Sequence, residues 1–127
     1  MGPLVSIITA TRNAMADLPG LAEAVLRLPS GQVEWIVIDG VSTDGTPRFL
    51  EGLGDPRVRW WSEPDSGIYD AWNKGVDRAL GRWILFLGAD DRPGPGWIEA
   101  CAAAPEVDLV YGDLLVQDAA GTALARV

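Results

Sequence analysis

The sequence has 127 residues, of which 48% are hydrophobic and 22% are charged, a composition typical of one globular domain and not of a disordered chain. It contains no histidine and one cysteine, Cys101, which excludes a histidine-based triad, an intrachain disulfide and a cysteine-rich zinc site. Because histidine is absent and only one cysteine is present, a bound metal would need oxygen ligands. The net charge is −8 and the sequence has no basic stripe, so we expect no nucleic-acid partner.

Apolar runs alternate with helical stripes along the first half of the chain. The runs at 4–11 and 33–39 are rich in β-branched residues, which predicts two buried strands. Leucine, alanine and valine recur at helical spacing between them, and the Pro-Ser-Gly segment at 29–31 predicts the end of that helix. Thr46 followed by Pro47 is typical of an N-cap and a first helical residue. This half is predicted to hold strands at 4–11, 33–39 and 57–62, a helix within 14–28 and a helix at 46–53.

The second half continues the alternation. It is predicted to hold a helix at 68–80, a strand at 82–88, a helix at 96–104, a strand-like segment at 107–118 and a hairpin return through Ala120-Gly121. The β-α-β-α-β order predicts an α/β fold, a three-layer α/β/α sandwich with a mainly parallel sheet. The apolar runs are far shorter than the ~20 residues of a membrane span, so no transmembrane segment is expected.

Polar residues gather where the predicted strands end. They lie at 11–13, 39–46 and 63–67, and Asp90 and Asp91 follow the fourth strand. Because ligands of open parallel sheets bind beyond the carboxyl ends of the strands, this coincidence predicts a ligand site there.

Four segments carry a family resemblance. SIITATRN, WIVIDGVSTDGT, SEPDSGIYDAWNKG and FLGADD occur in this order, and together they resemble the inverting glycosyltransferases of family 2, which have the GT-A fold. The resemblance runs from about Leu4 to Val116. It implies transfer of a sugar from a UDP-, GDP- or dTDP-sugar donor to a saccharide or glycolipid acceptor, with Mn²⁺ or Mg²⁺ as cofactor. It also implies a cytoplasmic place in polysaccharide or glycolipid assembly for the cell envelope, with peripheral association at the inner membrane face as one option.

The resemblance assigns the metal to Asp91, and it assigns Asp90 to the ribose or the metal. A cation held by carboxylates would neutralise the diphosphate as it leaves, which suits Mg²⁺ or Mn²⁺. Taken without the other motifs, adjacent aspartates would instead favour a cap for the helix near Pro95 or a plain turn.

The nucleoside contacts implied by the resemblance fall on Ala10, Thr11, Asn13, Asp39 and Asp65. Asp39 would accept a hydrogen bond from the base, or else hold an Asx-type turn in the loop that follows it. Asp65 would contact the nucleoside, although Pro-Asp-Ser-Gly is also a favourable turn sequence by itself.

Three positions leave alternatives open. Many family members have a second acid directly after Asp39, where this chain has Gly40. Arg12 stands where an aromatic residue is common, so it would stack on the base, pair with a phosphate or remain solvated. Lys74 would meet the diphosphate or form an i,i+4 ion pair with Asp70.

A general base is missing from this pattern. Inverting transfer needs one to deprotonate the acceptor hydroxyl, and the resemblance places it in a C-terminal, acceptor-binding half. Asp113 and Asp118 are the last acids, and neither lies in a recognisable base motif. We therefore expect residues 1–127 to form one nucleotide-sugar-binding domain without its acceptor-binding part. The chain would be truncated, completed by an oligomer or partner, or a non-catalytic nucleotide-binding module. A truncated half would expose a sheet edge, which favours a homo-oligomer.

Overall fold

The structure is a computed structural model that describes residues 2–127. The chain separates into two compact units, with the boundary between Gly94 and Pro95. We describe each unit by itself.

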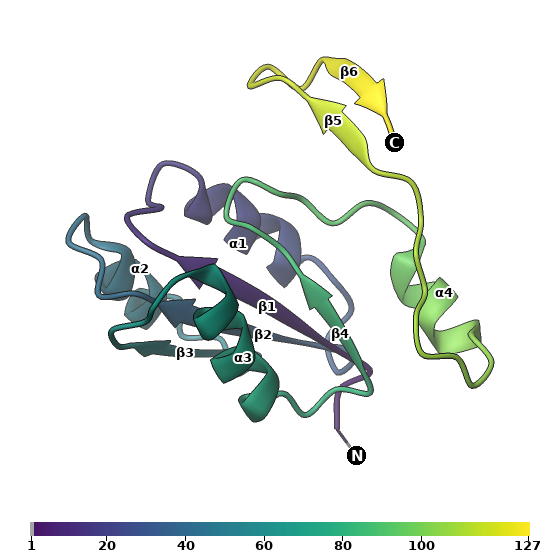
Figure 1. The fold of residues 1–127 in the computed structure, drawn as a ribbon, viewed down its shortest axis with the longest axis horizontal. Coiled ribbons are helices and arrows are strands. Elements are labelled where there is room, and N and C mark those ends of the chain that lie inside the picture. The colour runs from purple at the N-terminus through teal and green to yellow at the C-terminus, as the bar shows by residue number, and fades with distance from the viewer. Residues whose placement is uncertain (1) are drawn as a thin grey trace. The chain divides into compact units, whose positions relative to one another are not determined.

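The first unit is built on a four-stranded parallel sheet, which Figure 1 shows with helix α3 lying across it. Its strands are β1 (Val5–Thr11), β2 (Val33–Asp39), β3 (Val58–Ser62) and β4 (Trp83–Phe86), in the order β3-β2-β1-β4. β1 pairs with β2 along its whole length, from Val5 opposite Val33 to Thr11 opposite Asp39. Their carboxyl ends therefore coincide, and Ser62 at the end of β3 lies opposite Asp39.

Three helices connect these strands. They are α1 (Leu18–Leu26), α2 (Thr46–Gly52) and α3 (Ile68–Arg78). The sheet grows outward through β2 and β3 and then returns to β4 on the other side of β1. Because parallel crossovers are right-handed, this order places α1 and α2 on one face and α3 on the other. The predicted three-layer α/β/α sandwich is confirmed.

The core follows from the alternation of side chains along the two central strands. Ile8, Ile36 and Ile38 point to one face and pack against Ala71 of α3. On the neighbouring positions, Trp35 is fully buried and its indole Nε1 donates a hydrogen bond of 3.0 Å to Thr9 Oγ1. Both faces of these strands are buried, as expected for a parallel sheet covered on both sides.

The start of α2 differs by one residue from its prediction. Gly45, with a φ of 92°, occupies the N-cap, and Thr46 is the first helical residue. The Thr46 hydroxyl is buried and donates to Asp44 Oδ1 over 2.6 Å. Asp44 Oδ1 also accepts from the Thr46 amide over 3.1 Å, so Asp44 binds the first helical residue and Thr46 does not act as the predicted cap.

The second unit contains α4 (Trp97–Ala103) and an antiparallel pair, β5 (Leu115–Gln117) and β6 (Ala123–Arg126). The predicted hairpin through Ala120-Gly121 is confirmed, and Asp118 Oδ1 accepts hydrogen bonds from the Ala120 and Thr122 amides. The strand prediction for 107–118 is wrong for all but 115–117, because residues 107–111 form no ladder with the two described strands of their own unit.

No helix within residues 2–127 has both the length and the apolar character needed to cross a bilayer.

Candidate functional site

Asp39 joins the carboxyl ends of the three strands β1, β2 and β3. Its Oδ1 accepts hydrogen bonds from Thr11 Oγ1 at 2.8 Å and from Ser42 Oγ at 2.6 Å. Its Oδ2 accepts from Ser62 Oγ at 2.8 Å and from the Ser42 amide at 2.9 Å. With 0% of its surface exposed, Asp39 offers four acceptor sites to four donors.

These bonds decide the charge of Asp39. Burial by itself raises the pKa of the carboxyl, but the hydrogen bonds from Ser42, Thr11 and Ser62 outweigh it and hold the pKa below its ordinary value. Asp39 is therefore an anion at neutral pH. The turn closed by Ser42 is present, while contact between Asp39 and a base stays a prediction.

Asn13 links the loop after β1 to the loop after β2. Its backbone lies in the left-handed region, with a φ of 51°, which asparagine tolerates better than most residues. The Asn13 amide donates to Ser42 Oγ over 2.8 Å, and its side-chain oxygen accepts from the Thr43 amide over 2.8 Å. The two loops are thereby fixed to each other, and Asn13 shapes the site from outside the pocket described next.

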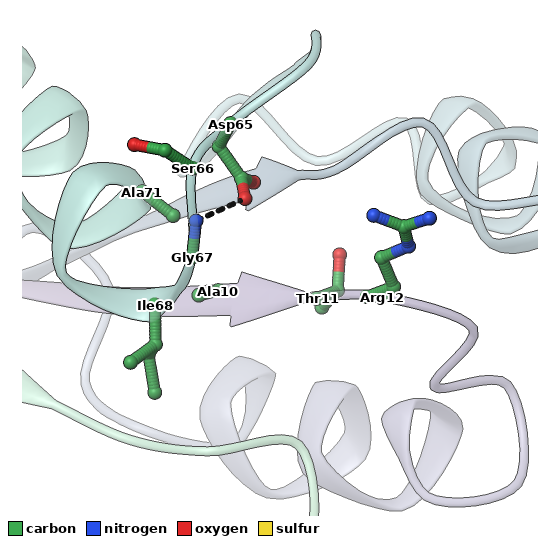
Figure 2. Close-up of a pocket in the computed structure, with 8 residues that line it drawn as sticks. All are labelled: Ala10, Thr11, Arg12, Asp65, Ser66, Gly67, Ile68 and Ala71. Carbon is green, nitrogen blue, oxygen red and sulfur yellow. Dashed lines mark hydrogen bonds between the residues drawn. The ribbon is translucent and has the colours of Figure 1, made fainter.

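A pocket of about 490 Å³ opens at the carboxyl end of β1, a volume that suits a small-molecule ligand. Figure 2 shows the segments that form it: the end of β1 on one side, and the turn before α3 with the start of that helix on the other. Its lining residues are Ala10, Thr11, Arg12, Asp65, Ser66, Gly67, Ile68 and Ala71.

Three of the predicted nucleoside residues therefore meet in one pocket, namely Ala10, Thr11 and Asp65. The turn is closed by the Gly67 amide, which donates to Asp65 Oδ1 over 3.0 Å (Figure 2). Ser66 also lines the pocket and lies within the predicted polar segment 63–67. Ile68 and Ala71 line it too and were missed by the sequence analysis, although their place at the start of a helix after that segment was a usable signal.

Gly40 leaves room for both Asp65 and Arg12 beside its backbone. A Cβ at this glycine would stand 2.9 Å from Asp65 Oδ2 and 3.5 Å from Arg12 Cδ. The missing side chain therefore lets both residues approach the backbone at the end of β2.

Lys74 fixes the turn that carries Asp65. Its ammonium donates to the Pro64 carbonyl over 2.8 Å and lies 3.5 Å from Glu63 and 3.6 Å from Asp70. The Asp70 carboxylate accepts a hydrogen bond from the Ser66 amide, and this bond, together with Lys74, lowers the pKa of Asp70. The predicted i,i+4 ion pair is thus present, and it is one of the contacts that hold the turn to α3.

Asp90 and Asp91 follow β4 on an exposed loop. The Gly88 amide donates to Asp91 Oδ2 over 2.8 Å, and the Asp91 amide donates back to the Gly88 carbonyl over 3.0 Å. A Cβ at Gly88 would stand 3.2 Å from Asp90 Oδ1 and 3.1 Å from Asp91 Oδ2, so both carboxylates converge over this glycine.

This convergence fits a divalent cation that is shared with a ligand. Among residues 2–127 there is no group of three or more histidine, cysteine, aspartate or glutamate side chains that could hold a metal alone. Mg²⁺ and Mn²⁺ commonly take one or two carboxylates and complete their coordination with phosphate oxygens and water. The aspartate pair supplies that number of carboxylates.

The fold belongs to the GT-A class of nucleotide-sugar transferases. The mannosyltransferase PcManGT of Pyrobaculum calidifontis, solved with GDP-Man and Mn²⁺, matches with a TM-score of 0.70 and 25% identity over 93% of this chain and 36% of its own. The structure of Staphylococcus aureus TarS 1–349 with UDP-GlcNAc matches in fold, with a TM-score of 0.67 and 24% identity over 81% of this chain and 30% of its own.

Sequence comparison gives the family. The profile described as Glycosyl transferase family 2 matches residues 6–121, and the chain belongs to this family. A relative from Mycobacterium tuberculosis, described as a PGL/p-HBAD biosynthesis glycosyltransferase, is 40% identical over 124 residues. The match covers 91% of this chain and 48% of the relative, so the chain spans about half the length of that protein.

Proposed function

We propose that the chain binds the nucleotide of a nucleotide-diphosphate sugar and serves as the donor site of a glycosyltransferase that acts on a saccharide or glycolipid. The observation that carries this proposal is the pocket at the end of β1, where Thr11, Arg12 and Asp65 supply polar groups beside an apolar wall. The nucleotide sugars bound by PcManGT and TarS support it.

Within this pocket each polar group has a proposed role. The Asp65 carboxylate accepts hydrogen bonds from the nucleoside, and the Arg12 guanidinium stacks on the base or meets a phosphate. Asp39 and Asn13 hold the loops around the pocket, so their proposed contribution to nucleoside binding passes through the positions of Thr11 and Ser42.

We also assign the divalent cation, Mn²⁺ or Mg²⁺, to Asp91 with Asp90 beside it on the cation or the ribose. When bound, the cation would neutralise the charge that the diphosphate acquires as the glycosidic bond breaks. The two carboxylates would bind and orient it from one side, and their shared position over Gly88 supports this assignment.

A non-catalytic nucleotide-binding module remains the second candidate function. In the second unit Asp113 contacts Arg126, and Asp118 closes the hairpin turn. We assign neither residue as the general base that an inverting transfer needs.

The test is a thermal-unfolding panel with UDP, GDP, dTDP and CDP, each with and without Mn²⁺. A nucleotide at 100 times its Kd stabilises the protein by about 2.7 kcal/mol. We expect a Mn²⁺-dependent rise in Tm with at least one nucleotide, and we expect Asp91→Asn to abolish it. Asp77→Asn, an exposed change on α3, is the matched control and keeps the rise.

The absence of a shift with every nucleotide would contradict both candidate functions. Mn²⁺-dependent release of nucleotide from the matching nucleotide sugar would favour the transferase, while binding without release would favour the module.

A further inference from the structure

Arg92 lies directly after the aspartate pair, yet its guanidinium contacts main-chain oxygens and not the two carboxylates. Its NH1 donates to the Ala89 carbonyl over 3.0 Å and to the Asp91 carbonyl over 2.6 Å. Its NH2 donates to the Asp17 carbonyl over 3.4 Å. One side chain therefore ties the loop after β4 to the residue that precedes α1.

Gly20 provides the space for this contact. It is the third residue of α1, and a Cβ on it would stand 2.3 Å from Arg92 NH2 and 3.2 Å from Arg92 Cζ. Carbon and nitrogen atoms do not pack at 2.3 Å, so any side chain at position 20 would displace the guanidinium. Because the displaced atoms end a flexible side chain, the helix itself can accept alanine.

We propose that Arg92 is a positioning residue, which fixes the loop so that Asp90 and Asp91 present their carboxylates together, and that Gly20 makes this possible. The inference rests on the proposed function, since it concerns the cation assigned to those aspartates. Arginine suits this positioning role because its planar, permanently charged guanidinium group can donate hydrogen bonds to several carbonyls at once. Arg92 itself contacts neither carboxylate, and Asp91 Oδ2 takes its hydrogen bond from the Gly88 amide.

The effect on the cation should be large for a residue that does not touch it. Loss of a group that orients a metal ligand typically costs 10–100-fold in metal affinity or activity. Arg92 orients two such ligands through the carbonyls on either side of Asp90.

Gly20→Ala tests this proposal while Arg92 stays in the chain. Alanine is favoured over glycine within a helix, so Tm should stay level or rise by a few degrees. We expect Mn²⁺-dependent binding of the nucleotide diphosphate that the wild type prefers to weaken about tenfold or more, as measured by calorimetry. Binding in EDTA should not change.

Gly52→Ala is the matched control. Gly52 is the last residue of α2, and a Cβ on it would meet nothing within 4 Å. This variant should gain the same helix stabilisation and keep the wild-type affinity in Mn²⁺.

A double-mutant cycle and hydrogen exchange complete the test. If Gly20 acts through Arg92, adding Gly20→Ala to Arg92→Ala causes no further loss of Mn²⁺-dependent affinity. Without metal or nucleotide, the Gly88 and Asp91 amides should exchange faster in Gly20→Ala than in the wild type.

Two results would overturn the proposal, and they have different meanings. Wild-type affinity in Mn²⁺ together with wild-type exchange in Gly20→Ala would refute the role of Arg92 alone. A wild type that binds nucleotide equally well in Mn²⁺ and EDTA would refute the proposed cation site, and this inference with it.

Discussion

Val41 has a backbone conformation that its residue type does not favour. Its φ of 59° lies in the left-handed region, where a β-branched side chain is a clear outlier. The neighbouring Ser42 is held by two hydrogen bonds to Asp39, so the surrounding loop imposes this conformation on Val41. No sequence pattern indicated this strain, because it depends on where Asp39 anchors the loop.

Val41→Gly should therefore stabilise the protein. Relief of the left-handed strain should raise the free energy of unfolding by about 1–3 kcal/mol. The greater conformational freedom of glycine stabilises the unfolded chain and offsets part of this increase. We expect a net increase of about 1 kcal/mol in the free energy of unfolding, measured by urea denaturation. Val41→Ala keeps a Cβ at the same φ and should gain much less. A lower stability of Val41→Gly would show that the conformation is not strained.

Asp39 should make the free energy of unfolding fall as the solution becomes acidic. Because hydrogen bonds hold its pKa in the folded protein below that in the unfolded chain, the carboxylate stabilises the fold at neutral pH. That contribution is lost as the pH falls below about 4 and passes through the folded pKa. Asp39→Asn should lower the free energy of unfolding at pH 7 by about 2–3 kcal/mol and flatten its fall in acid.

Acid titrations of both proteins by circular dichroism check this expectation. Asp77→Asn, on the surface of α3, should follow the wild-type curve. Parallel curves for the wild type and Asp39→Asn would contradict it.

At the scale of elements, the turn before α3 is held in place by its hydrogen bonds with Lys74 and Asp70. Lys74→Met removes the donor to the Pro64 carbonyl and loosens the turn that carries Asp65. We expect binding of the free nucleoside and of its diphosphate to weaken equally, by about fivefold or 1 kcal/mol each. Calorimetry with both ligands tests this role of Lys74. If Lys74 contacted a phosphate directly, Lys74→Met would weaken binding of the diphosphate alone. Lys74→Arg should restore part of the affinity.

The sequence predicted elements well where burial alone determines them. The prediction for β2 has the observed bounds, because β-branched and aromatic residues dominate it and it ends in an aspartate, as is typical of a buried strand whose carboxyl end lies at a site. The strand prediction failed at 107–114, because a strand there would need a neighbouring strand, and the local sequence pattern does not reveal one.

For the candidate site, sequence reasoning predicted pocket-lining residues at a strand end, Thr11, and in the turn that follows another strand, Asp65, because topology brings the carboxyl ends of parallel strands to one edge. It could not find the contact between Arg92 and Gly20, which are far apart in the chain and joined only by packing. The roles of the predicted nucleoside and metal residues stay predictions.

At the scale of the whole molecule, the apolar side chains on α3 and β4 favour self-association. β4 is an edge strand, Tyr69 is 74% exposed, and Trp72 stacks on the 40% exposed Phe86 with 4.5 Å between ring centroids. The net charge of −8 opposes contact between copies, and salt screens it.

We therefore expect sedimentation velocity at micromolar concentration to show association that strengthens from about 50 to 500 mM NaCl. Tyr69→Ser should weaken it, while Asp77→Asn should not. A monomer at every salt concentration would contradict this prediction.

The close approach between Gly40 and Asp65 has a consequence for the evolution of the family. A Cβ at position 40 would stand 2.9 Å from Asp65 Oδ2, and an acid there would add like-charge repulsion. Replacement of Gly40 by any other residue should therefore be accepted only together with a change at position 65. Relatives with aspartate at position 65 should carry glycine at position 40, and those with an acid at position 40 should have a shorter or uncharged residue at position 65.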